Sequence, residues 1–175
     1  MRFPMTLDSW VKGVTAFTVV AMGIWFPAMT MAMGSTNAPW GVSVLVKVCA
    51  GLVGVVLLWT ALGAPTAVKV TNAALVIERR ALGDYEIPWS EVETAQEAPA
   101  ITIRGDVRRV AGNGGFFGFT GLFRVKDVGT VRCWATRLNR PTVLVARKNA
   151  RPVLLGVDDA RALLDAIRRR LSHAH

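Results

Sequence analysis

The stretch Ala67–Val92, AVKVTNAALVIERRALGDYEIPWSEV, decides the fold because it alternates short apolar runs with turn-forming residues. Asn72-Ala73 separates two runs rich in β-branched residues, which predicts a β-hairpin. Gly83-Asp84 forms the next turn, and Tyr85–Ile87 predicts a third strand. These pieces are too short and too closely spaced for parallel βαβ units, so they predict an antiparallel sheet.

The same pattern continues towards the C-terminus. Ser90–Thr94 is compatible with either a further strand or a short turn. Further strands are expected at Ile101–Ile103, Val107–Val110, Val128–Thr136, Thr142–Ala146 and Pro152–Leu155. In Val128–Thr136, Val131, Cys133 and Ala135 alternate with Arg132, Trp134 and Thr136, as in a strand with two different faces. About seven strands of this kind predict an antiparallel sandwich or barrel.

A C-terminal helix is expected after the last strand. Asp158 or Asp159 is suited to cap its start, and Arg168–Arg170 match the partial negative charge of its end. One face carries apolar residues at three- and four-residue spacing: Ala160, Leu163, Leu164, Ile167 and Leu171. We expect this face to cover an open end of a small barrel.

The N-terminal third has a different composition. The chain has 175 residues, of which 52% are hydrophobic and 19% charged, and its mean hydropathy is +0.37. Residues 1–65 carry four charged groups, which are Arg2, Asp8, Lys12 and Lys47. Two apolar stretches, at about 13–33 and 42–62, are long enough to cross a bilayer as helices. Lys47 lies near the outer end of the second, where its ammonium group can reach the headgroups. The sequence therefore predicts a membrane hairpin over 1–65 and a globular domain over 66–175.

The basic residues predict the orientation of this hairpin. Arg2 and Lys12 precede the first stretch, and Lys69, Arg79 and Arg80 follow the second. The positive-inside rule therefore places both termini in the cytoplasm. The alternative is a cleaved signal peptide, with Ala32-Met33-Gly34 as its cleavage site.

The strand motifs resemble those of a known family. Val70-Thr-Asn72, Leu75–Glu78 and Tyr85–Val92 resemble the opening of bacterial pleckstrin-homology-like domains. The central block Gly112–Arg124, with Gly129, Trp134–Thr136 and Val143–Val145 after it, is similar to one branch of that family. The resemblance covers about residues 66–171.

This resemblance implies a pleckstrin-homology-like barrel of about seven strands with one C-terminal α-helix. Small membrane proteins with one or two spans ahead of the domain are common in this family, which agrees with the two-helix transmembrane hairpin predicted over residues 1–65 and with a bacterial inner membrane. Members of the wider family that bind phosphoinositides usually hold basic residues in their first loop. Here that loop is Asn72-Ala73, with only Lys69 nearby, which argues against stereospecific binding of an inositol phosphate.

The central block has two interpretations. Its glycines do not have the spacing or the following helix of a nucleotide-binding loop. Structurally, glycines permit unusual backbone angles and close strand approach while Phe116, Phe119 and Phe123 fill a core. Functionally, a candidate lipid or partner surface is formed by Phe116, Phe117, Arg124 and Lys126.

Catalysis has few candidate residues. The histidines, His173 and His175, lie at the C-terminus, and Cys133 is expected to be a buried apolar residue. We expect no enzyme activity, no cofactor, no metal and no nucleic-acid partner. The net charge of +7 over residues 66–175 suits a surface beside anionic lipids or a solvated juxtamembrane domain.

The sequence thus predicts a non-enzymatic binding module, anchored in the membrane, that recognises a protein partner or the lipid state at its cytoplasmic face. The alternative is a structural or docking subunit of a larger membrane complex.

Overall fold

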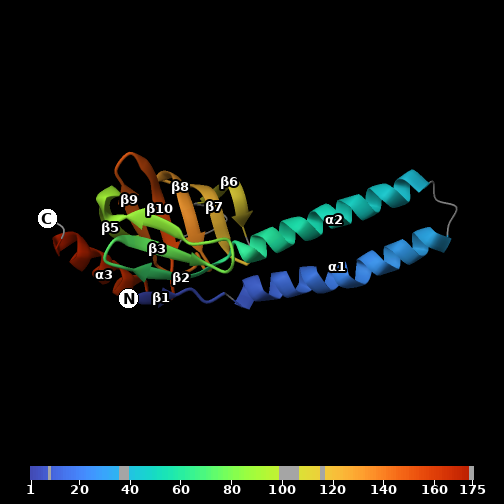
Figure 1. Cartoon of the computed structure of the whole chain (residues 1–175), viewed down its shortest axis with the longest axis horizontal. Coiled ribbons are helices and arrows are strands. Elements are labelled where there is room, and N and C mark those ends of the chain that lie inside the picture. Colours follow the sequence, from blue (N-terminus) through green and yellow to red (C-terminus); the bar gives the residue numbers. More distant parts are fainter. Residues whose placement is uncertain (8, 36–39, 99–106, 115–116, 174–175) are drawn as a thin grey trace.

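Two long helices project from a β domain in the computed structural model, which describes residues 1–7, 9–35, 40–98, 107–114 and 117–173. Helices α1 (Ser9–Ser35) and α2 (Trp40–Leu62) run antiparallel and side by side (Figure 1). Helix α3 (Ala160–His173) packs at the opposite end of the domain.

The domain is built from two sheets. The first has the strand order β1-β2-β3-β4, formed by Arg2–Pro4, Pro65–Val70, Ala74–Arg79 and Tyr85–Pro88. The second has the order β5-β9-β10-β8-β7-β6, formed by Val92–Ala98, Thr142–Arg147, Ala150–Gly156, Gly129–Ala135, Phe119–Val125 and Val107–Gly114. All described pairings are antiparallel except that of β8 with β10. The expected mainly antiparallel β domain with a C-terminal helix is therefore confirmed.

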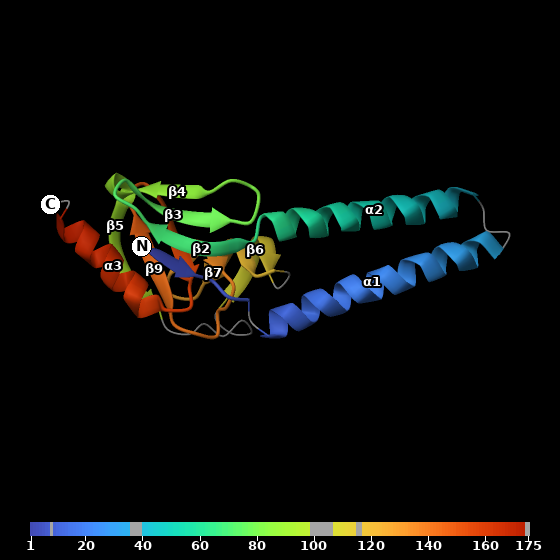
Figure 2. The ribbon, with the colours of Figure 1, turned by 60° about the horizontal axis from the view of Figure 1, so that its bottom comes forward.

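The main core lies between the two sheets and under α3 (Figure 2). Strand β3 contributes Leu75 and Ile77, and α3 contributes Leu163 and Ile167, all fully buried. Asp159 caps α3, since its Oδ1 accepts a hydrogen bond of 3.0 Å from the Ala162 amide. The apolar face predicted for this helix is thus confirmed.

A second core covers the other face of the six-stranded sheet. Val131, Cys133 and Ala135 of β8 are fully buried in it, so the predicted alternation along this strand is confirmed. Phe119 and Phe123 pack beside them, with ring centroids 6.5 Å apart.

The first seven residues are part of the domain, although no periodic pattern in them indicates a strand. The Met1 ammonium group donates a 2.9 Å hydrogen bond to the Val70 carbonyl, and β1 pairs with β2. Met5 is buried in the main core and Leu7 packs against the second, in which Val11 of α1 is also buried. The segment therefore joins both cores just before α1 begins, whereas the sequence had grouped it with the helices.

Asp158 fastens this segment to the end of β10. Its carboxylate accepts hydrogen bonds from the Thr6 amide at 3.1 and 3.3 Å and from Thr6 Oγ1 at 2.8 Å. Arg137 lies 3.8 Å from the same carboxylate and also bonds to the Thr6 hydroxyl. Of the two aspartates considered for the helix cap, Asp159 has that role and Asp158 holds the N-terminal segment.

Only part of the expected membrane hairpin meets the criteria for a span. Among the described residues, α2 is the one helix long and apolar enough to cross a membrane, with a mean hydropathy of 2.4. The apolar stretch assigned to α1 is shorter, Val11–Trp25. A transmembrane hairpin of two helices is therefore not confirmed.

Three expectations for the strands have different outcomes. Ser90–Thr94 divides between a 3-10 turn (Trp89–Glu91) and β5. The glycine and phenylalanine block, expected as a loop before a strand, instead forms the β6–β7 hairpin. Gly112 pairs with Gly121 in this ladder, so glycines lie inside the strands as well as in the turn. Ile101–Ile103 lies outside the described residues.

Candidate functional site

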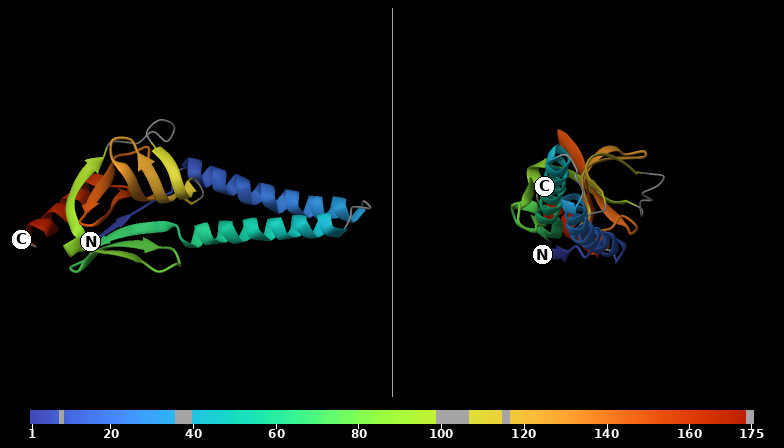
Figure 3. Two further views of the ribbon diagram at one scale, coloured as in Figure 1. Left: turned by 90° about the horizontal axis from the view of Figure 1, so that it is seen from above. Right: turned by 90° about the vertical axis from the view of Figure 1, so that its right-hand side faces the viewer.

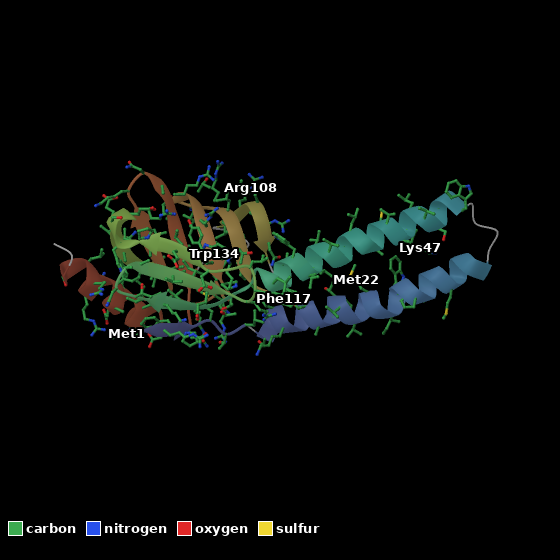
Figure 4. All side chains as sticks on the ribbon, viewed as in Figure 1. Met1, Met22, Lys47, Arg108, Phe117 and Trp134 are labelled. Atoms are coloured by element: carbon green, nitrogen blue, oxygen red, sulfur yellow. The ribbon has the colours of Figure 1, made fainter. Side chains whose placement is uncertain are left out.

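The surface expected from the central block is only partly visible. Phe116 lies outside the described residues. Phe117 is half-buried at the base of α1, where its amide donates a 3.4 Å hydrogen bond to Thr15 Oγ1 and Arg80 lies over its ring (Figure 4). Its φ of 55° is in the left-handed region.

Arg124 and Lys126 are exposed on β7 and in the turn after it. Arg124 lies directly opposite Arg108 on β6. Two like charges facing each other across a ladder oppose strand pairing, so this position favours an anionic neighbour outside the fold.

A cavity of about 850 Å³ lies where the helices meet the β domain. Its walls come from α1, α2, the end of β3 and strands β6, β7 and β8. Figure 3 shows this junction from above, with α2 leading directly into β2. The volume falls within the range of small-molecule sites.

Three arginines from different strands line the cavity. The Arg79 guanidinium lies 5.8 Å from the centre of the Trp134 ring and donates to the carbonyls of Leu82 and Gly83. The Arg132 guanidinium lies 5.0 Å from the Tyr85 ring centre. These contacts hold two cations in fixed positions.

The third arginine, Arg109, is exposed, and its guanidinium has no hydrogen bond or ion pair with any residue that the structure describes. Arg79 and Arg132 likewise form no salt bridge with a carboxylate among the described residues. The described lining contains no acidic side chain. The domain side of the cavity is therefore electropositive.

The helix side of the cavity is mainly apolar, with Thr18 and Thr60 as its polar residues. It is formed by Met22 of α1 and by Leu52, Val53, Val56 and Leu57 of α2. A second groove, of about 630 Å³, runs along α1 as far as Ala28 and shares Thr18 and Met22 with the cavity. The two hollows therefore adjoin at Thr18 and Met22, on the side of the cavity that the helices form.

A pair of glycines shapes the cavity floor. Gly112 and Gly121 lie opposite each other in the β6–β7 ladder with φ values of +115° and +123°. A Cβ on Gly112 would lie 2.3 Å from the Thr120 carbonyl oxygen, and one on Gly121 would lie 2.4 Å from that of Ala111. The structural interpretation of the glycine block is confirmed at these two positions, because only glycine allows this close approach.

The central block of the sequence and the β domain around it match the family model described as Bacterial PH domain, over residues 66–171. The chain belongs to the bacterial PH domain family. The search of curated proteins and the search of solved structures each find no match. PH domains are typically non-enzymatic binding modules.

The reactive and metal-ligating side chains of this PH domain are few. Burial raises the pKa of the Cys133 thiol, which opposes formation of a thiolate. Among the described residues, no group of three or more His, Cys, Asp and Glu side chains is placed to hold a metal ion. His175 lies outside the described residues, and the side chain of His173 is not among those described.

The ion-pair network around Glu78 lies away from the cavity. Hydrogen bonds from Lys69 and Arg2 hold the pKa of Glu78 below its usual value. This network ties β1, β2 and β3 together and is structural.

The sequence did not point to the cavity. Arg79 was noted only for orientation, and Arg109 and Arg132 were not singled out. Their positions in three separate strands give no spacing that would connect them.

Proposed function

We propose that this chain is a membrane-anchored binding module that recognises anionic components at the cytoplasmic face of a bacterial inner membrane. The helices hold the PH domain at the bilayer, and its basic surfaces provide recognition. No catalytic step is part of the proposal.

The continuity between the helices and the domain is the observation that carries this proposal. Helix α2 ends at Leu62, and the chain enters β2 at Pro65 through the buried Ala64. On the other side, Met5 and Val11 anchor the residues around the start of α1 in the two cores. A membrane that held α2 would therefore hold the domain against its surface.

The exposed apolar side chains of α2 support its insertion in lipid. No described residue of α2 is buried, and Leu45, Leu52 and Val55 are each more than 60% exposed. An apolar surface of this size is unfavourable in water. Insertion of α1 beside α2 would place both chain termini on the side of the domain, as the basic residues predict.

Chemical labelling tests the anchoring and the orientation. We would fractionate bacterial membranes, extract them with alkaline carbonate, and label a Ser172→Cys variant in a Cys49→Ala background with a membrane-impermeant maleimide. The chain is expected to resist extraction and to be labelled only after the cells are broken. The same background without the added cysteine is the control. Extraction into the soluble fraction, or labelling of intact spheroplasts, would contradict the proposal.

A second experiment tests whether the basic end of the β6–β7 hairpin, formed by Arg108, Arg124 and Lys126, faces lipid headgroups. A polarity-sensitive dye on Lys126→Cys is compared with the same dye on Asp165→Cys, an exposed position on α3 at the far end of the domain. In anionic vesicles the emission at position 126 is expected to shift to the blue, with a smaller shift in about 0.5 M salt because charges are then screened. Equal emission at both positions in neutral and anionic vesicles would place the hairpin away from the membrane.

A further inference from the structure

We propose that the cavity between the helices and the PH domain binds one anionic phospholipid. The phosphate lies beside Arg79, Arg109 and Arg132, and an acyl chain follows the groove on α1. This inference rests on the proposed membrane anchoring and adds to it a defined site and a ligand class.

The charge of the cavity selects an anion. Three arginines, from β3, β6 and β8, line a space whose described walls contain no carboxylate. Guanidinium groups bind phosphate through paired hydrogen bonds. Because aromatic rings already restrict the Arg79 and Arg132 side chains, these side chains lose less conformational entropy when a ligand binds.

The apolar half of the cavity selects an amphiphile over a free anion. Met22 and Val56 line the wall opposite the arginines, and the groove that shares Thr18 and Met22 continues to Ala28. At a rise of 1.5 Å per residue, the ten-residue path from Thr18 to Ala28 is about 15 Å long. A soluble phosphate would leave this surface uncovered, whereas an acyl chain would cover it.

The depth of the site matches that of a lipid headgroup. The arginines lie at the domain end of α2, where its apolar stretch gives way to β2. A phospholipid in the adjacent leaflet has its phosphate at this level and its chains beside the helices.

Native mass spectrometry of the full chain, released from an uncharged detergent, tests the inference. The probes are phosphatidylglycerol and phosphatidylcholine with identical acyl chains. We expect one phosphatidylglycerol to remain bound with an affinity at least several-fold above that for phosphatidylcholine.

Two adjacent arginines provide a matched pair of variants. Arg109→Gln removes a charge from the cavity, and Arg108→Gln removes the same charge from the neighbouring position, which does not line it. Arg109→Gln is expected to weaken phosphatidylglycerol binding about fivefold, the factor that corresponds to about 1 kcal/mol. Arg108→Gln is expected to leave the affinity for phosphatidylglycerol within about twofold, because Arg108 lies outside the cavity and contributes only to the general attraction between the domain and anionic lipids. Equal losses in the two variants would overturn the proposal.

A second pair tests the acyl chain. Met22→Trp fills the point that the cavity and the groove share, whereas Val19→Trp adds the same bulk on an exposed position of α1. Only Met22→Trp is expected to reduce binding. Displacement of the lipid by inorganic phosphate at a comparable concentration would show a phosphate site and overturn the lipid assignment.

The two proposals fail in different ways. If the chain leaves the membrane on carbonate extraction, the anchoring itself is wrong. If the chain stays in the membrane but binds both lipids equally, only the cavity assignment is wrong.

Discussion

Replacing Asp158 by asparagine is expected to loosen the N-terminal segment from the β domain without changing the helix beside it. The Asp158 carboxylate accepts hydrogen bonds from both the amide and the hydroxyl of Thr6 and lies 3.8 Å from Arg137. Its side chain is 25% exposed, so solvent screens these interactions only in part. Asparagine keeps one acceptor oxygen and loses the charge and one hydrogen bond.

A hydrogen bond to a charged group contributes about 1.5–3 kcal/mol, and partial exposure reduces this value. We therefore expect Asp158→Asn to lower the free energy of unfolding by about 1–2 kcal/mol. For a domain of this size, the Tm would fall by roughly 3–10 °C. Asp159→Asn is the matched control, because asparagine caps a helix about as well as aspartate, and its effect is expected to stay within about 0.5 kcal/mol.

Hydrogen exchange of the full chain in detergent locates the effect. The Met5 amide donates to Thr66 O at 2.9 Å, and the Val70 amide donates to Met1 O at 2.8 Å. Both amides are expected to exchange faster in Asp158→Asn and to keep their rates in Asp159→Asn. Unchanged exchange in Asp158→Asn, or the same loss in both variants, would show that this carboxylate does not hold the segment.

Three further predictions concern the β domain. Thr142 is fully buried, and its hydroxyl has no hydrogen-bond partner among the described residues. Thr142→Val is therefore expected to leave the free energy of unfolding unchanged or to raise it by up to about 1 kcal/mol. A marked fall in Tm would reveal a hidden partner. Gly121→Ala is expected to lower the free energy of unfolding by about 2–4 kcal/mol, because of both its positive φ and the clash with the β6 backbone. Gly83→Ala, with φ +70° and open space around it, is expected to lower it by about 1–2 kcal/mol in the same thermal assay. Equal losses in the two variants would contradict the close-approach argument. Because the folded state lowers the pKa of Glu78, the ionised Glu78 side chain contributes to stability above its unfolded pKa near 4.5, and this contribution is lost as the pH falls through the folded pKa. The fall in Tm on acidification below pH 4.5 is therefore expected to be smaller in Glu78→Gln than in the wild type. Identical pH profiles would contradict the role of this ion pair.

Much of the β domain followed from local patterns. The hairpin at Asn72-Ala73, the alternation around Cys133 and the apolar face of α3 each depend on residues close together in the chain. Such periodicity directly reflects which side of a strand or helix is buried. The long apolar α2 was predictable for the same reason.

The site residues were harder to predict. Phe117 was named as part of a candidate lipid or partner surface, and the structure places it half-buried against α1, a contact across 102 residues of chain. Arg124 and Lys126 are exposed as expected, although their role stays a prediction. Of the two interpretations of the glycine block, the structural one is confirmed at Gly112 and Gly121, but the hairpin was taken for a loop because glycines break the periodic signal of a strand.

The sequence by itself determined the apolar helix, most of the strands and the capped C-terminal helix, because these depend on local periodicity and on capping residues. The tertiary structure alone decided that Arg2–Pro4 add an edge strand to the first sheet and that Arg79, Arg109 and Arg132 share one cavity with α1 and α2. A three-residue strand is too short to show a period, and arginines in three separate strands have no common spacing. Only the pairing of the sheets and their junction with the helices bring these groups together.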